Sequence, residues 1–165
     1  GTDAMRVIVT MITDRTQQDA ALAESIYRRT WQDLTEEERA AYSAGLKGAY
    51  KASDLNRVGL ALITVRDRLR THGIDVPAEV RTDYEANEVI TSAAMTDYIK
   101  SVNAVYAAVQ TNAPEPPKSM ENLTWEGANN IERAIIAVDD VLESREIGWI
   151  YADAELYAGD MEEIT

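Results

Sequence analysis

Apolar residues recur every three or four positions along three long stretches after residue 50, which is the spacing of one face of an α-helix. The most regular stretch follows Ser53 and ends before Gly73, a residue that can close a helix in a left-handed conformation. The pattern therefore predicts three long helices, which begin near Ser53, Thr91 and Thr124. Their stripes are formed by Leu55, Val58, Leu62, Val65 and Leu69, by Met95, Tyr98, Ile99, Val102, Val105, Tyr106 and Val109, and by Ala128, Ile131, Ile135, Val138 and Leu142.

Two capping boxes predict shorter helices before residue 50. In each box a threonine is followed three residues later by an acid, Thr16 by Asp19 and Thr35 by Glu38, so that side chains and backbone donors at the helix start satisfy one another. The first box predicts a helix over about 17–30, and the second predicts a short helix that ends in a glycine-containing turn. The apolar edge of the first helix consists of Leu22, Ile26 and Tyr27.

The stripes can close around a shared core, so the expected fold is all-α: a compact helical bundle of about four main helices plus a short one, over residues 13–148. A coiled-coil seam between subunits is the alternative. Each helix, however, carries only about three heptads and more apolar positions than a seam needs. The stretch 75–88 should be irregular, and Pro114, Pro116 and Pro117 should form a stiff extended connector.

Both ends of the chain are expected to be extended. Residues 1–12 form an N-terminal arm, in which 1–4, before Met5, resemble a remnant of an expression tag. Residues 149–165 form an acidic and aromatic C-terminal segment, which could pair with Val7 to Ile12 as a small β element. Because this segment alternates apolar and acidic residues, its apolar members are the candidate partner interface: Trp149, Ile150, Tyr151, Leu156 and Tyr157.

Charge narrows the choice of partners. The chain has 165 residues, which suits one domain, and a formal net charge of −13, which DNA phosphates and anionic headgroups would repel. We therefore expect no nucleic-acid partner. The longest apolar run near the start, Val7 to Ile12, is too short to span a bilayer, so no membrane insertion is expected. The absence of cysteine excludes disulfides, thiolate metal sites and a cysteine nucleophile.

Candidate chemistry is sparse, and we expect no catalytic residue, no cofactor and no metal site. His72, the single histidine, lies at a predicted helix end without a triad-like pattern around it and is expected to favour the carbonyl end of the helix. Four acids are expected on the polar face of the last helix, because a glycosidase pair needs carboxylates from separate elements: Asp139, Asp140, Glu143 and Glu146. The acidic ending lacks the glycine-centred loop of an EF-hand and is expected to be solvated: Asp153, Glu155, Asp160, Glu162 and Glu163.

Two further sets of residues each allow more than one interpretation. Polar residues near helix starts could form a weak ligand site, although capping explains the asparagines more simply: Lys47, Asn56, Arg57 and Asn130. The aromatic residues are three tryptophans and eight tyrosines without phenylalanine, and each therefore has a polar atom to place. Packing at the core edge is the favoured reading, followed by protein contact and sugar stacking.

Four segments spanning most of the chain share an order and spacing that resemble a module of tail or minor structural proteins in tailed bacteriophages and prophages of Gram-positive bacteria. They are Thr13 to Asp19 (TDRTQQD), Leu46 to Val58 (LKGAYKASDLNRV), Ser119 to Glu132 with SMENLTW and ANNIE, and Trp149 to Asp160. The chain departs from the pattern at Thr82-Asp83-Tyr84, where the resembled module has a tryptophan in the third place.

The resemblance implies a non-catalytic structural module of the phage tail that docks onto or spaces other virion components. The partners would be other tail or virion proteins, with self-association as a further option, and the location would be the virion after synthesis in the bacterial cytoplasm. Recognition of host polysaccharide is the alternative, and a small hydrolase is the weaker one. An exposed aromatic trough would favour recognition, and a cleft with converging carboxylates would favour catalysis.

Overall fold

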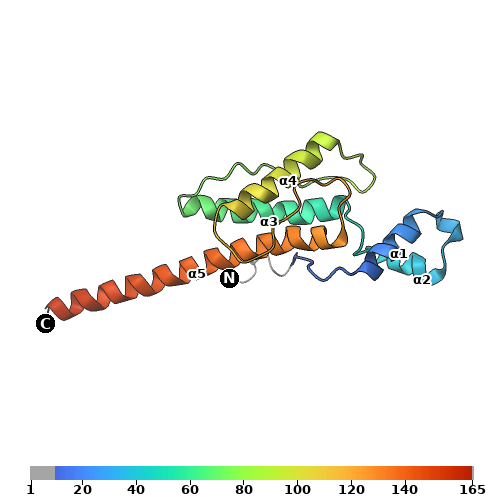
Figure 1. Ribbon diagram of the computed structural model, residues 1–165. Coiled ribbons are helices and arrows are strands. Elements are labelled where there is room, and N and C mark those ends of the chain that lie inside the picture. Colours follow the sequence, from blue (N-terminus) through green and yellow to red (C-terminus); the bar gives the residue numbers. More distant parts are fainter. Residues whose placement is uncertain (1–9, 165) are drawn as a thin grey trace.

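Every regular element between residues 10 and 164 is a helix, and no strand occurs in this range (Figure 1). The computed structural model describes residues 10–164, with side chains except those of Ile147 and 149–164. The expected all-α fold is therefore confirmed. The elements are α1 (Gln17–Tyr27), the 3₁₀ turn η3 (Trp31–Asp33), α2 (Glu36–Ser43), α3 (Ala52–Thr71), α4 (Ser92–Ala107) and α5 (Trp125–Ile164).

Helices α3, α4 and α5 pack around one hydrophobic core, and each contributes most of its predicted stripe. Leu62 on α3 and Ile131 on α5 are fully buried, and Val102 on α4 is 1% exposed. The connectors cover the same core, because Val76 and Ala78 from the irregular stretch are buried against it. The apolar stripes of the three helices therefore pack against one another within one chain, as the bundle prediction required.

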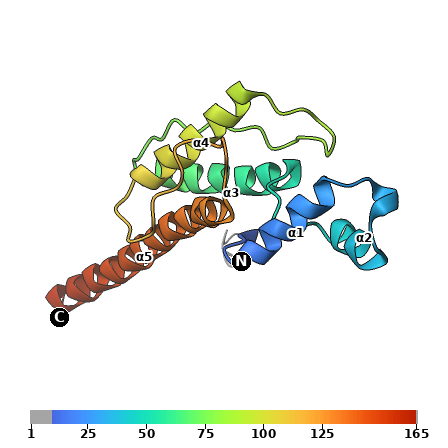
Figure 2. The same cartoon turned by 45° about the vertical axis from the view of Figure 1, so that its right-hand side comes forward.

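Helices α1 and α2 form a hairpin beside one end of the bundle (Figure 2). Both capping boxes are present, since the Thr16 and Thr35 side chains accept hydrogen bonds from the backbone three residues on and the acids at those positions bond back. The hairpin has a small core of its own, formed by Ala23, Ile26, Leu34 and Leu46. The first helix therefore does not join the bundle core, and it ends at Tyr27, earlier than predicted.

The ends of the long helices follow their local signals. Gly73 has φ of +80°, and His72 before it is the C-cap residue of α3. Thr91 caps α4 by accepting a hydrogen bond from the backbone of Ala94, and Thr124 accepts one from Gly127 at the start of α5. These helix ends agree with the sequence prediction because each cap depends on residues within one helical turn.

The last helix corrects the prediction for the C-terminal end. α5 continues without a break past residue 148 to Ile164, a total of 40 residues, so 149–164 are helical and not extended. The β element is wrong for the same reason, and Met11 and Ile12 lie in no strand, while residues 1–9 are outside the described range. At 1.5 Å per residue the helix is about 60 Å long, and both views show its C-terminal part projecting beyond the bundle (Figures 1 and 2).

Candidate functional site

A cluster of charged side chains lies buried where the segment before α1 meets α3 and α5. Arg15 is 3% exposed, Asp54 is 4% exposed and Glu132 is fully buried. Arg57, one turn after Asp54, covers the cluster from its outer side and keeps 23% of its side chain exposed. Ionised groups are costly to bury unless they are paired, so the contacts within this cluster decide its role.

The cluster alternates two guanidinium groups with two carboxylates. Nη2 of Arg15 lies 2.7 Å from Oε2 of Glu132 and 3.8 Å from Oδ1 of Asp54. Nη2 of Arg57 donates to Oδ1 of Asp54 at 2.8 Å and to Oε2 of Glu132 at 3.2 Å. The four formal charges cancel. The pKa of Arg57 is raised even though burial opposes this, because Glu132 and Asp54 accept its hydrogen bonds.

The same groups hold the backbone of residues 12–15 against the bundle. The backbone N–H of Ile12 donates to Oε1 of Glu132 at 2.7 Å. The backbone N–H of Arg15 donates to Oδ1 of Asn129 at 3.1 Å, and Nδ2 of Asn129 donates to the backbone carbonyl of Arg15 at 3.0 Å. Nε of Arg15 also donates to the carbonyl of Lys47 at 3.0 Å. The cluster is therefore a clamp that joins three distant segments.

Sequence reasoning missed this clamp. Arg15, Asp54 and Glu132 were not singled out, because a lone charged residue in a polar stretch looks solvated. One signal could have found them: Arg15 lies in TDRTQQD, Asp54 and Arg57 in LKGAYKASDLNRV, and Glu132 in ANNIE. Three of the four segments quoted for the resemblance therefore meet at this clamp, and the fourth, Trp149 to Asp160, does not.

Close backbone packing supports the clamp at Gly48. A Cβ atom placed on Gly48 would lie 2.0 Å from the backbone oxygen of Asp19, so α1 and the turn before α3 touch main chain to main chain. Gly48→Ala should therefore destabilise the protein by about 1–3 kcal/mol, the usual cost of forcing atoms into a packed site.

Urea unfolding followed by circular dichroism would measure this change. The matched control is Gly148→Ala, because a Cβ there meets nothing within 4 Å and alanine is the better helix former. A Gly48→Ala variant as stable as the parent would show that this approach is loose.

A second charged cluster corrects the assignment of Asp139 to the polar face of α5. Asp139 is fully buried and accepts a hydrogen bond from Arg68 of α3. Arg68 also donates to Glu146 at 3.2 Å, and Nε2 of His72 lies 3.3 Å from the same carboxylate. Burial opposes ionisation of Glu146, but hydrogen bonds from Arg68 and His72 outweigh it and lower its pKa. These carboxylates tie α3 to α5.

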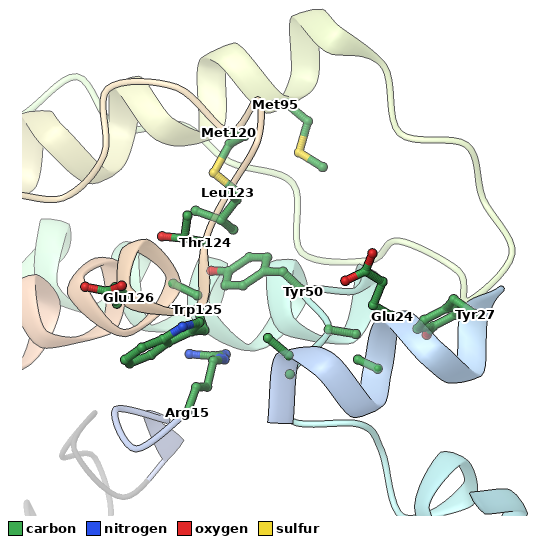
Figure 3. A pocket seen from close by; sticks show the side chains of 15 residues that line it. Arg15, Glu24, Tyr27, Tyr50, Met95, Met120, Leu123, Thr124, Trp125 and Glu126 are labelled. Carbon is green, nitrogen blue, oxygen red and sulfur yellow. The ribbon is translucent and has the colours of Figure 1, made fainter. Parts of the chain in front are cut away.

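A cavity of about 550 Å³ lies between α1 and the bundle, next to the clamp (Figure 3). Arg15 forms part of its wall, with its guanidinium carbon 5.4 Å from the ring centroid of Tyr50. The Tyr50 hydroxyl is hydrogen bonded to that of Tyr98, and burial raises the pKa of both phenols. The apolar lining is aromatic and thioether-rich: Tyr27, Tyr50, Met95, Met120, Leu123 and Trp125.

The described lining of this cavity contains two acidic side chains. Its acids are Glu24 and Glu126, and Glu24 is paired with Arg28 on the surface of α1. No histidine is among the described residues that line it.

The four residues predicted as a weak ligand site contact protein groups. The ammonium of Lys47 lies 3.4 Å and 3.6 Å from two carboxylates beside the start of α1. Asn56 uses both ends of its amide on the backbone of Tyr84, each at 2.8 Å. Arg57 belongs to the clamp, and Asn130 accepts a hydrogen bond from an arginine one turn along α5 at 3.4 Å. These contacts have structural roles, and the weak ligand site stays a prediction.

The predicted partner interface lies on the projecting part of α5. The side chains of Trp149, Ile150, Tyr151, Leu156 and Tyr157 are outside the described residues, as is the acidic ending considered for calcium. Among the side chains that are described, no three histidine, aspartate or glutamate residues gather in a way that could hold a metal ion. Between residues 10 and 164 no helix is long and apolar enough to cross a bilayer.

No protein-family model, curated protein or solved structure matches this chain. The functional inference therefore depends on the geometry described above and on the segments that carry the sequence resemblance.

Proposed function

We propose that this chain is a non-catalytic structural module of a bacteriophage or prophage tail, which docks onto or spaces other virion components. It would act in the virion after synthesis in the bacterial host cytoplasm. The order of the four resembling segments motivates the link to phage tails. The partners would be other tail proteins or further copies of the chain.

The observation that carries the docking role is the length of α5. A helix of 40 residues continues past the bundle core, and its C-terminal part projects in both views (Figures 1 and 2). The sequence of that part repeats apolar residues at intervals of three and four, which is typical of a helix that packs along another helix. The repeating residues are Ile147, Ile150, Ala154, Tyr157, Met161 and Ile164.

The clamp is consistent with this role. Its charges pair with one another, so three of the four segments quoted for the resemblance contribute to the stability of the module. A rigid bundle fused to a projecting helix has a defined direction, which a spacer needs and a flexible linker lacks.

The two alternatives have unequal support. For a small hydrolase, the carboxylates singled out on α5 are engaged, since Arg68 bonds to Asp139 and Glu146. No described feature favours that activity. For polysaccharide recognition, an exposed aromatic group around Trp31 is a specific favourable observation.

Deleting residues 152–165 should leave the bundle folded but abolish docking. We expect unchanged melting and a loss of far-ultraviolet helix signal limited to the removed turns, because the core residues of α5 among the described side chains lie between Ala128 and Leu142. Association with the parent tail protein, or self-association, would be measured by analytical ultracentrifugation.

Two point variants sharpen this test. Tyr157→Ser lies within the three-and-four spacing and should weaken association, whereas Ala152→Ser lies outside it and should not. Undiminished association of the truncated chain would contradict the docking role, and wholesale unfolding would place the segment in the core.

A further inference from the structure

Three aromatic side chains stand exposed together on the α1–α2 hairpin. Tyr27 is 55% exposed, Trp31 is 50% exposed and Tyr42 is 46% exposed. Their rings meet edge to face, with centroids 6.2 Å apart for Tyr27 and Tyr42 and 5.6 Å apart for Trp31 and Tyr42. We call these three residues the aromatic patch. Exposed apolar groups that gather in one place mark binding sites more often than scattered ones do.

Charged groups hold the aromatic patch in place. The guanidinium carbon of Arg39 lies 5.5 Å from the Trp31 ring centroid, and the same side chain donates to the carbonyl oxygens of Trp31 at 3.0 Å and of Gln32 at 3.2 Å. Arg29 bonds to Glu38 and links the end of α1 to α2, which lowers the pKa of Glu38 to about 2. A ring held this way loses little conformational entropy when a ligand stacks on it.

Packing of the hairpin does not explain the patch. The core between α1 and α2 contains only small and aliphatic side chains, Ala23, Ile26, Leu34 and Leu46. Burying a tryptophan or tyrosine would contribute more apolar area than any of these residues. Tyr27, Trp31 and Tyr42 nevertheless stay about half exposed, so the small core of the hairpin does not account for their grouping.

A hollow of about 280 Å³ adjoins the patch and shares two of its rings. Tyr84 faces the hollow from the loop before α4, where Asn56 holds its backbone and the guanidinium carbon of Arg81 lies 4.4 Å from its ring centroid. The lining combines rings with amide and hydroxyl groups: Tyr27, Tyr42, Tyr84, Ser53, Asn56 and Asn87.

We propose that the aromatic patch and this hollow bind a neutral hexopyranose unit of a polysaccharide. The C–H face of a pyranose stacks on an aromatic ring, and its hydroxyls need amide and hydroxyl partners, which Ser53 and Asn87 supply from exposed positions. Aromatic rings are also common in protein interfaces, so the exposed amide and hydroxyl groups beside the rings are what favour a sugar here.

The charges favour a neutral sugar over an acidic one. Lys51 is the charged residue in the described lining, and its ammonium already lies 3.3 Å from Oδ2 of Asp54 and donates to the carbonyl of Leu46 at 3.1 Å. The net charge of −13 also repels anionic polymers.

The test is isothermal titration calorimetry with maltohexaose, cellohexaose and chitohexaose at millimolar concentration. We expect at least one of them to bind, and Trp31→Ala and Tyr42→Ala to weaken it roughly tenfold each. Asn87→Ala, in a loop away from the hairpin core, should also weaken binding and cannot act by unfolding the hairpin. Leu60→Ala is the matched control, because Leu60 is 56% exposed but lies on α3 away from this lining.

The proposal is overturned if none of the three sugars binds, or if Trp31→Ala, Tyr42→Ala and Asn87→Ala all bind as the parent does. Loss of association with a tail protein in the Trp31→Ala variant, without sugar binding by the parent, would assign the patch to a protein partner and overturn it as well. Truncation at residue 152 should leave sugar binding unchanged, so this site and the docking role fail independently.

Discussion

Glu132→Ala is expected to destabilise the protein by about 3–5 kcal/mol, the usual cost of removing one partner from a buried ion pair. Glu132 is fully buried, and its loss would leave the guanidinium of Arg15 without its nearest carboxylate. The backbone N–H of Ile12 would lose its acceptor at the same time. Urea unfolding followed by circular dichroism measures the change.

The matched control is Glu126→Ala, an exposed glutamate on the first turn of the same helix, which should cost less than about 1 kcal/mol. The double variant Arg15→Met with Glu132→Met should lose less stability than the sum of its two single changes, because neither charge is then left unpaired. Additive losses would show that the two side chains do not act as a pair.

Leu62→Ala is expected to cost about 2–5 kcal/mol through lost burial and the cavity left behind. Leu62 is fully buried in the middle of α3, and α3 contacts both α4 and α5 around the common core. The free energy of unfolding in urea, with an unchanged dependence on urea concentration, would show that the change acts on packing alone.

Leu60→Ala serves as the control for this change, since Leu60 lies two residues away on the same helix but is 56% exposed. It should alter stability by no more than about 0.5 kcal/mol. A loss below about 1 kcal/mol for Leu62→Ala would mean that α3 is not central to the core.

The stripes and caps were predictable because helix periodicity and capping depend on residues within a few positions. Leu55 to Leu69 recur at helical spacing, and Thr16, Thr35 and Thr91 each cap within one turn. The C-terminal end was misread for a local reason as well. Its apolar and acidic residues seemed to alternate, but the residues from Ile147 to Ile164 also fit intervals of three and four, and no proline interrupts them.

The two charged clusters could not be predicted from residues a few positions apart. Arg57 and Glu132 are 75 residues apart in the sequence, and Arg68 and Asp139 are 71 apart, so their pairing follows from how α3 and α5 cross. The exposure of Trp31 could not be predicted either, because an aromatic residue in a turn can face either the hairpin core or solvent.

Local sequence thus determined where the main bundle helices begin and which faces of α3, α4 and α5 are apolar, since one turn of chain contains the necessary information. Tertiary structure decided which buried charges meet, that α1 pairs with α2 outside the bundle core, and which aromatic rings stay in solvent. Those outcomes depend on contacts between segments far apart in the sequence, and such contacts form only when the helices pack.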